Sequence, residues 1–350
     1  MSARLILVGG FLGAGKTTLL LAAARHLRGQ GGRVGVILND QGADLVDTRL
    51  AESAGFPAEE IAGGCFCCRF SQFMAAVERL AEREAPEFIL AEPVGSCTDL
   101  SATILQPIKR YHSGRFRLAP LTVLVDPARA EELLRPDGDP LAAYLFQKQI
   151  AEADVVCFSK ADRYERFPTL DGIEARKLSA LTGFGIPEWL NALLAAGAST
   201  GSRLLEIDYQ LYAEAEAALG WLNWRANLHL ARALTPAALA GPLIAHLDKL
   251  LTESGIAIAH LKVFAQSANG YLKASVCRNG EKPSVEGQLD APPARRYALT
   301  LNLRALGAPE KLSAAVEHAI HQMPGTVRVT RQQSFRPSPP MPEHRFKEVV

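Results

Sequence analysis

Two groups of residues have the types and spacing that binding chemistry requires. Residues 10–17, the phosphate loop, read GFLGAGKT and fit the pattern G-x-x-x-x-G-K-[ST]. Residues 63–68, the thiol loop, read GGCFCC and place Cys65, Cys67 and Cys68 within four positions. The first pattern predicts a site for nucleoside phosphates, and the second predicts metal or redox chemistry.

The phosphate loop suits its ligand for physical reasons. Glycines let successive backbone N–H groups turn toward one anion, and the N-terminus of a following helix adds a partial positive charge. Lys16 would reach the β- and γ-phosphates, while the hydroxyl of Thr17 would bind Mg²⁺. The predicted nucleotide ligands of this segment are Gly10, Gly13, Ala14, Gly15, Lys16, Thr17 and Thr18.

Two later segments predict which base is bound. Residues 159–162, the guanine loop, read SKAD and resemble the motif N-K-x-D. Asp162 would accept from the guanine N1–H and N2 amino group, a donor pair that adenine lacks, and the stem of Lys160 would lie over the base. Ser159 replaces the usual asparagine and loses one tie to the phosphate loop. Residues 179–183 (SALTG) resemble the loop whose backbone N–H, here expected at Ala180, meets the guanine carbonyl.

The three thiols of residues 63–68 are too close together for a disulfide framework. They suit Zn²⁺ or another thiophilic divalent ion, and tetrahedral geometry needs at least one more ligand. A carboxylate, a histidine such as His112, a water molecule or a client protein could supply it. Oxidation of adjacent thiols and packing of cysteines as small core residues are the alternatives. The isolated Cys97, Cys157 and Cys277 are expected to be packed.

These motifs stand in the order found in one family. Residues 39–47 (NDQGADLVD) are similar to the switch segment N-E-F-G-E-x-x-x-D of CobW-type GTPases, and Asn39, Gly42 and Asp47 match it. The thiol loop matches the family signature G-G-C-x-C-C, and residues 92–95 (EPVG) resemble its E-x-x-G element. The chain therefore resembles CobW-type proteins, named for cobalamin synthesis, over most of residues 4–185.

The resemblance implies a role for each matched residue. Lys16, Asp47 and Glu92 would be catalytic, and Thr17, Asp47 and Glu92 would hold Mg²⁺. Gly95 would turn its N–H toward the γ-phosphate when the switch closes. The implied cofactors are GTP or GDP, Mg²⁺, and Zn²⁺ or another thiophilic divalent metal bound by the three cysteines.

The chain departs from the family at several points. Asp40 and Ala43 stand where the family has glutamates, so any metal-binding or water-positioning role of those glutamates is weakened or moved. Only its position in the sequence suggests Asp44 as a replacement. Many relatives carry a histidine-rich stretch between their domains, whereas the histidines here are scattered. Asp126 matches a family V-D-x element, for which we expect a structural role.

The elements that must position these residues are short apolar strands that alternate with helix-length segments. Residues 5–8, 34–38, 88–91, 121–125 and 155–158 have the composition of buried parallel strands. We therefore predict an α/β fold, in which a P-loop NTPase domain with a mostly parallel sheet is followed by a smaller α+β C-terminal domain.

The predicted domains are residues 1–196 for the GTPase domain and 205–334 for the α+β domain, with a Gly/Ser-rich linker at 197–202. Prolines in residues 335–350 predict a mobile tail. In the second domain we predict strands at 221–230, 256–265, 271–276 and 297–304, and helices at 236–253 and 309–323.

Composition limits the partners. With 38 basic and 37 acidic residues the net charge is +1, so no charge excess argues for a nucleic-acid or membrane-surface partner. No apolar run approaches the roughly 20 residues that span a bilayer, and the first apolar run is too short for a signal peptide. We expect a cytoplasmic protein, and a homodimer is left open.

Three functions are compatible with these patterns. The resemblance implies slow GTP hydrolysis coupled to delivery of a metal or metallocofactor (zinc, cobalt or a corrinoid) to a client metalloprotein or corrinoid enzyme. Because the thiol loop lies between the Asp47 and Glu92 segments, nucleotide state and metal state would be linked. A non-catalytic metal buffer or sensor is the first alternative, which the replaced acids favour. A small-molecule kinase is the second, although no segment has the pattern of a substrate site or lid.

Overall fold

The computed structural model describes residues 3–42 and 46–350. It forms two compact units, which consist of separate stretches of the chain. Unit 1 comprises Met1–Gln41, Asp47–Ala215 and Pro339–Val350, and unit 2 comprises Gly42–Val46 and Glu216–Ser338. Ala43 and Asp44, considered above for the switch segment, lie outside the described residues.

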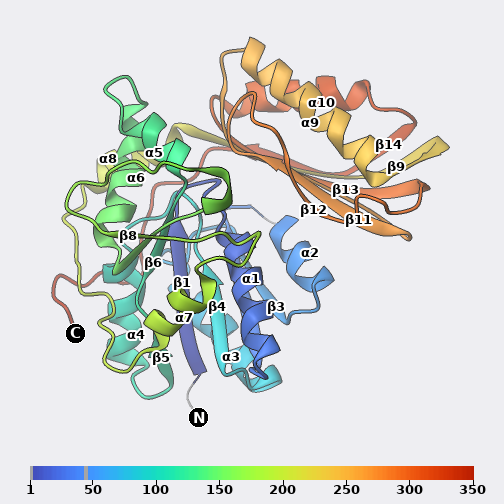
Figure 1. Ribbon diagram of the computed structural model, residues 1–350. Helices are drawn as coiled ribbons and strands as arrows, with labels where there is room; N and C mark the ends of the chain where they lie inside the picture. Colours follow the sequence, from blue (N-terminus) through green and yellow to red (C-terminus); the bar gives the residue numbers. More distant parts are fainter. Residues whose placement is uncertain (1–2, 43–45) are drawn as a thin grey trace. The chain divides into compact units, whose positions relative to one another are not determined.

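Unit 1 is built on an eight-stranded sheet (Figure 1). The order along the sheet is β3-β2-β4-β1-β6-β7-β8, and β5 pairs with the first residues of β1. Every described pairing in this sheet is parallel. The strands are β1 (Ala3–Gly10), β2 (Val34–Asp40), β3 (Ala58–Ala62), β4 (Phe88–Glu92), β5 (Phe116–Leu118), β6 (Thr122–Val125), β7 (Val155–Phe158) and β8 (Ala175–Lys177).

Helices cover both faces of this sheet. α1 and α7 contact each other on one face, while α3 packs on β2 and β3 and α6 packs on β1 and β6 (Figure 1). The parallel connections between neighbouring strands require such crossovers. The helices are α1 (Lys16–Gly29), α2 (Val46–Ser53), α3 (Phe70–Glu84), a π-helical turn (Ser101–Leu105), α4 (Gln106–Tyr111), α5 (Pro127–Leu133), α6 (Pro140–Glu152), a 3₁₀ turn (Ala161–Arg163), α7 (Ile186–Leu194) and α8 (Tyr209–Ala217).

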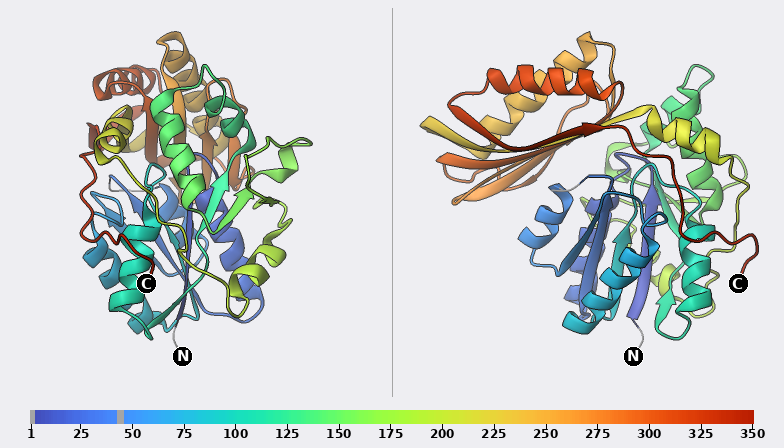
Figure 2. Two further views of the ribbon diagram at one scale, coloured as in Figure 1. Left: turned by 90° about the vertical axis from the view of Figure 1, so that its left-hand side faces the viewer. Right: turned by 180° about the vertical axis from the view of Figure 1, so that it is seen from behind.

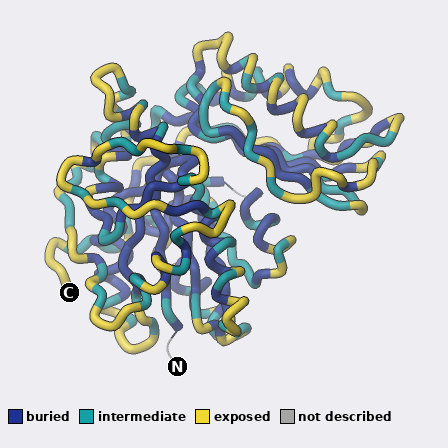
Figure 3. The backbone as a smooth tube through the Cα atoms, in the orientation of Figure 1, coloured by how far each residue is buried: buried dark blue, intermediate teal, exposed yellow. Residues whose placement is uncertain are grey.

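The central strands of unit 1 are apolar because both of their faces are covered. β1, β2, β4 and β6 are almost entirely buried, and they form the dark-blue interior of Figure 3. Parallel strands end at one common edge of the sheet, which places the phosphate loop after β1, Glu92 at the end of β4 and the guanine loop after β7 close to one another.

Unit 2 is a six-stranded sheet with two helices against it. The strand order is β12-β11-β10-β13-β9-β14, and the described pairings are antiparallel. Leu222, Trp224 and Ala226 of β9 join the apolar core beneath the helices, while Trp221 points away and lies under Arg304. The elements are β9 (Leu219–Leu234), α9 (Pro236–Glu253), β10 (Ala257–Ser267), β11 (Gly270–Val276), β12 (Ser284–Gly287), β13 (Ala294–Leu306), α10 (Pro309–His321) and β14 (Thr326–Phe335).

The predicted fold class is confirmed, since a mostly parallel sheet with helices is followed by a separate antiparallel sheet. No helix of the described chain combines the length and the apolar character needed to cross a bilayer. The segment predicted as a linker is fixed on unit 1, because the carboxylate of Asp154 accepts from the N–H groups of Gly201 and Ser202. The division between the units falls instead after Ala215.

The prolines near the end of the chain do not leave that segment free in the structure. Phe335 ends β14, and Pro339–Val350 forms part of unit 1. Proline prevents regular secondary structure here, but the residues between the prolines keep their N–H groups. Met341, between two prolines, and Glu343 and Phe346, after the last one, donate their N–H groups to unit 1 and so hold an irregular segment in place.

Candidate functional site

The phosphate loop connects β1 to α1, as the sequence predicted. Gly10 is the last residue of β1, Gly13 and Ala14 lie in the turn, and Gly15 precedes the first turn of α1, which contains Lys16, Thr17 and Thr18. Gly15 has φ 92°, a left-handed conformation that a side chain would strain. This arrangement presents the N-terminus of a 14-residue helix to the loop.

Three side chains of the predicted phosphate and Mg²⁺ site converge at the carboxyl ends of β1 and β4. The Lys16 ammonium donates to the Gly10 carbonyl at 2.8 Å and lies 3.9 Å from a carboxylate oxygen of Glu92. The Thr17 hydroxyl donates to the other oxygen of Glu92 at 2.7 Å. A hydroxyl and a carboxylate are ligand types that Mg²⁺ takes beside phosphate oxygens, so these residues fit that ion.

The segment after Glu92 lies directly against the phosphate loop. A Cβ atom at Gly95 would be 3.1 Å from the backbone nitrogen of Leu12, so only glycine fits here without a shift. Gln149 of α6 holds the segment in place, because its side-chain amide donates to the carbonyls of Gly95 and Cys97 at 3.0 and 2.8 Å. Sequence reasoning missed Gln149, whose only signal is an amide on the apolar face of a helix.

The guanine loop leaves β7 through a left-handed residue, Lys160, with φ 54°. Its carboxylate, Asp162, accepts a hydrogen bond from the hydroxyl of Ser179. The structure thereby brings residues 159–162 together with residues 179–183, where Ala180 follows Ser179. The backbone N–H of Ser159 donates to the carbonyl of Val125 at 2.9 Å, which anchors the loop to β6.

Asp126 was expected to have only a structural role, but it also contacts a residue of the guanine loop. Its carboxylate caps α5 by accepting from Ala128 N at 3.1 Å and accepts the hydroxyl of Tyr164 at 3.1 Å. It also forms an ion pair with the Lys160 ammonium at 2.6 Å. Asp126 therefore fixes the lysine whose stem is predicted to cover the base.

Asn39 connects the end of β2 to the thiol loop. Its side-chain amide donates to the carbonyls of Ile61 and Gly64 at 3.0 and 2.7 Å, and its oxygen accepts from Phe66 N at 2.9 Å. Because Asn39 is buried, these bonds are not in competition with water. One side chain thus fixes the backbone on both sides of Cys65.

The three cysteines of the thiol loop converge, and they are the one group of three or more His, Cys, Asp or Glu ligand atoms that lies within 4.8 Å in the described chain. The Sγ separations are 2.7 Å for Cys65–Cys67, 3.2 Å for Cys65–Cys68 and 3.8 Å for Cys67–Cys68. Tetrahedral zinc thiolates have Sγ atoms about 3.8 Å apart. The donor set fits a thiophilic ion, provided that Cys65 and Cys67 separate by about 1 Å.

The thiols differ in acidity because they share hydrogen bonds. Hydrogen bonding with Cys67 and Cys68 lowers the pKa of Cys65 well below its ordinary value. The bond to Cys65 raises the pKa of Cys67, and the same partner raises the pKa of Cys68 to about 12. The cluster therefore loses its first proton at Cys65. A cation bound by all three thiols would have to displace the protons of Cys67 and Cys68 as well.

Other predicted ligands lie as follows. Asp47 is buried in the first turn of α2, and Asp40 is the last residue of β2. His112, the candidate fourth ligand, lies beside Phe70 with 6.2 Å between ring centres and is not part of the thiol group among the described residues. Burial lowers the pKa of His112.

A C-terminal contact with the thiol loop was not predicted. The backbone N–H of Met341 donates to Cys68 Sγ at 3.1 Å. Nothing local in the sequence marks this contact, because the partners are 273 positions apart.

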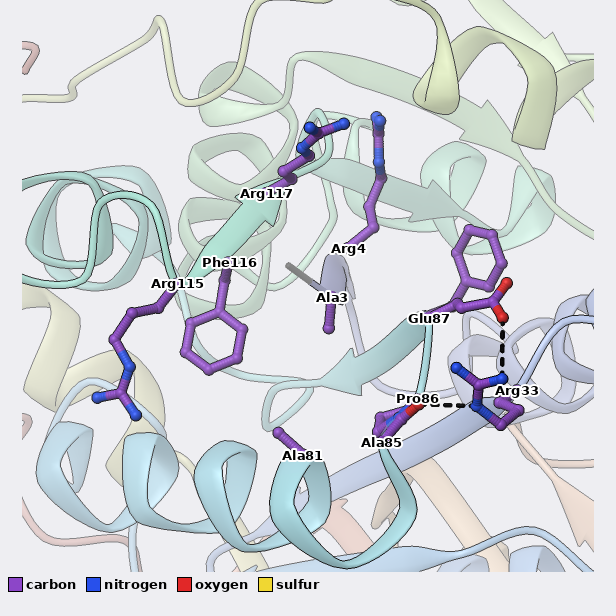
Figure 4. A pocket seen from close by; sticks show the side chains of 11 residues that line it. Ala3, Arg4, Arg33, Ala81, Ala85, Pro86, Glu87, Arg115, Phe116 and Arg117 are labelled. Carbon is purple, nitrogen blue, oxygen red and sulfur yellow. Dashed lines mark hydrogen bonds and ion pairs between the residues drawn. The ribbon is translucent and has the colours of Figure 1, made fainter. Parts of the chain in front are cut away.

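A cavity of about 730 Å³ lies at the opposite edge of the unit 1 sheet, at the amino ends of β1 and β4. Ala3, Ala81 and Phe116 line its interior, and four arginines lie around it (Figure 4). Arg33 is paired with Glu87, and Arg115 points away from the cavity (Figure 4). The cavity therefore belongs to neither predicted site.

Comparison with known proteins gives a consistent family. The CobW/HypB/UreG nucleotide-binding domain matches residues 4–180. The zinc chaperone CobW of Pseudomonas aeruginosa is 30% identical over 241 residues, 60% of either chain. The zinc chaperone YeiR of Escherichia coli is 28% identical over 164 residues, 45% of this chain and 46% of the relative. The chain thus spans about half to three fifths of the length of these relatives.

Solved structures are similar at low sequence identity. HypB from Helicobacter pylori in complex with nickel has a TM-score of 0.42 and 20% identity, covering 55% of this chain and 86% of that one. Zn(II)-bound YjiA GTPase from Escherichia coli has a TM-score of 0.33 and 13% identity, covering 91% and 99%. The family match itself takes in the phosphate loop, the thiol loop and the guanine loop, and by that match the chain belongs to the CobW/HypB/UreG family.

Proposed function

We propose that this chain is a GTP-hydrolysing metallochaperone, which couples its nucleotide state to delivery of a thiophilic metal or a metallocofactor to a client protein. Family membership supports the nucleotide chemistry, and two curated relatives are named zinc chaperones. The three converging thiols support Zn²⁺ or a similar ion as cargo. We assign the protein to the cytoplasm, where reducing conditions keep such thiols free.

In the proposed reaction, Lys16 turns from the Gly10 carbonyl to the β- and γ-phosphates, where its charge offsets that of the transferring group. The Thr17 hydroxyl, which donates to Glu92 in the structure, would hold Mg²⁺, and Glu92 and Asp47 would be its carboxylate ligands or orient water. Mg²⁺ would supply charge neutralisation at the phosphates. Gly95, already against the phosphate loop, would offer its N–H to the γ-phosphate.

Guanine would be selected by the Asp162 carboxylate, which Ser179 orients, and by the Lys160 stem, which Asp126 holds. Ala180 would add a backbone N–H toward the guanine carbonyl. Adenine would leave the Asp162 carboxylate without donors, which is a costly mismatch.

The observation that carries the coupling is the position of Asn39. In the β2–β4 pairing, Leu38 lies opposite Glu92. Asn39, which fixes the thiol loop, is the next residue of β2, so it lies beside the strand that ends in Glu92. A change at Glu92 and Gly95 therefore reaches the thiols through one shared strand pair. Linked binding of this kind is reciprocal, so nucleotide and metal must change each other's affinity.

The direct test is metal affinity in two nucleotide states. Competition against a chromophoric chelator, with GDP and then with a non-hydrolysable GTP analogue, should give zinc affinities that differ by about 5- to 150-fold. Cys67→Ser should lose most zinc affinity yet bind GTP as the parent does, because sulfur supplies the metal bonds and not the nucleotide site. Equal affinities in both states would contradict delivery and favour a metal buffer.

Turnover of GTP by the parent and not by Lys16→Ala would separate an enzyme from that alternative.

A further inference from the structure

The C-terminal segment, Pro339–Val350, lies on unit 1 beside the thiol loop (Figure 2, right, dark red). Its first described contacts are to two of the three cysteines. The Met341 N–H donates to Cys68 Sγ at 3.1 Å. The Glu343 N–H donates to the Cys67 carbonyl at 3.0 Å. The segment therefore contacts Cys68, the most exposed thiol of the cluster, at its Sγ atom.

The side chain of Glu343 anchors the segment to α3. Its carboxylate accepts from the backbone N–H of Ser71 at 3.0 Å and from the Ser71 hydroxyl. Ser71 is in the first turn of this 15-residue helix, where backbone N–H groups lack helical partners and attract an anion. This anchor is three residues from Cys68 in sequence, so it fixes the segment at the edge of the thiol loop.

A second anchor lies beyond the Glu92 segment. The Arg345 guanidinium forms an ion pair with the Asp99 carboxylate at 2.6 Å and donates to the Leu205 carbonyl at 2.8 Å. Asp99 is 2% exposed and also accepts from the Tyr209 hydroxyl, so its charge depends on these partners. Loss of Arg345 would leave a buried carboxylate without its cation.

Further along, the segment continues on the same surface. The Phe346 N–H donates to the Ala102 carbonyl at 3.0 Å, and the Val350 N–H donates to the Gln106 side chain at 2.8 Å. Extended backbone bonds with side-chain anchors at alternate positions are how proteins bind peptides on a surface. Here the peptide belongs to the same chain.

We propose that Cys67, Cys68, Ser71, Asp99 and Ala102 form a peptide-docking surface, that the C-terminal segment is its resident occupant, and that the segment closes the thiol cluster. Cys68 is only half-buried beside the segment, and full exposure of its Sγ requires Glu343 and Arg345 to leave their partners. A metal acceptor must then displace the segment, and an extended chain with an acidic side chain followed two residues later by a basic one would fit the same anchors. Transfer of metal from the thiols to an acceptor rests on the proposed function, whereas the accessibility of Cys68 does not.

The test is the reaction rate of Cys68 in the full-length, reduced, metal-free protein. Alkylation with iodoacetamide, followed by mass spectrometry of the Cys68 peptide, measures that rate without nucleotide or metal. The double variant Glu343→Ala/Arg345→Ala removes both anchors and should raise the rate at Cys68 by roughly tenfold or more, because each anchor is a charge-assisted hydrogen bond. Amide exchange at Met341 and Phe346 should accelerate together with it.

Two controls separate opening of the segment from general loosening. Lys347→Ala changes an exposed residue of the same segment and should leave the Cys68 rate at the parent value. Cys277, in unit 2, should react equally fast in all three proteins and reports on the overall fold. A parent-like Cys68 rate in the double variant would overturn the proposal. Zinc affinities that do not depend on nucleotide would contradict the proposed function and leave this result standing.

Discussion

Asp162 is a residue at which one atom should decide base selectivity. Its Oδ1 accepts from the Ser179 hydroxyl, and an asparagine can keep that bond while placing an amide donor where Oδ2 was. We expect Asp162→Asn to weaken GTP by roughly tenfold or more and to improve binding of xanthosine triphosphate, whose base offers an acceptor there.

Titration with fluorescent nucleotides would measure this change. Asp171→Asn, at an exposed carboxylate between the two loops that meet the base, is the matched control and should bind like the parent. Equal affinity of the parent for ATP and GTP would refute guanine selectivity altogether.

Glu152 is a fully buried carboxylate whose protonation should affect stability. Desolvation raises the pKa of Glu152 to about 8, although Ser101 N–H and the Thr98 hydroxyl donate to it. In the unfolded chain the same group titrates near pH 4.5. The folded state therefore holds a proton that the unfolded state releases, and its stabilising effect is present below pH 4.5 and lost as pH rises through 8.

Glu152→Gln should remove this pH dependence, because the amide can accept from Ser101 and donate to the hydroxyl of Thr98. Urea unfolding at pH 5.5 and pH 8 should show a loss of roughly 2–3 kcal/mol for the parent in excess of the loss for the variant. Glu131→Gln, an exposed residue of α5, should behave as the parent. Parallel pH profiles for parent and Glu152→Gln would show that Glu152 is ionised in the folded protein.

At the scale of elements, the thiol loop depends on the strand before it. Asn39 bonds two carbonyls and one N–H of buried residues in this loop and in the strand before it. Asn39→Ala keeps all three cysteines but frees their backbone, and we expect zinc affinity to fall roughly 10- to 100-fold, as for other residues that support metal ligands. Chelator competition would measure it, with Asn191→Ala on exposed α7 surface as control. An unchanged affinity would mean that the loop holds its shape unaided.

The sequence predicted the elements that have a strong apolar pattern and missed those that lack one. The five predicted strands of the first domain correspond to β1, β2, β4, β6 and β7. β3 reads AEEIA and carries two glutamates, while β5 and β8 are three residues long. Such strands form because a neighbouring strand offers backbone partners, and this information is not local.

The candidate site follows the same division. Contiguous motifs placed the phosphate, guanine and thiol loops, whereas Gln149 and the C-terminal segment act on residues 52 and more positions away. No periodicity encodes such contacts. The roles of all the predicted site residues in binding nucleotide and metal, Asp47 and Ala180 among them, stay predictions.

At the scale of the whole molecule, nucleotide should stabilise one unit and not the other. The predicted ligands of GTP lie in unit 1, while unit 2 has its own apolar core. With GTP analogue and Mg²⁺ at about 100 times the dissociation constant, unit 1 should gain roughly 2.7 kcal/mol. Amide exchange should slow in β1 and β4 and stay unchanged in β10 and β13. Equal slowing in all four strands would show that the units unfold as one.

Unit 1 is assembled from stretches that are far apart in the chain, and this has a consequence for synthesis. A ribosome completes residues 1–215 before it adds 216–338, and only then does it add Pro339–Val350. At roughly 5–20 residues per second, that interval is on the order of ten seconds. During it, the nascent chain can already fold its phosphate and thiol loops while the segment that meets Cys68 does not yet exist. A metal ion that binds during this interval would therefore enter an open site, and every later exchange would have to displace the segment.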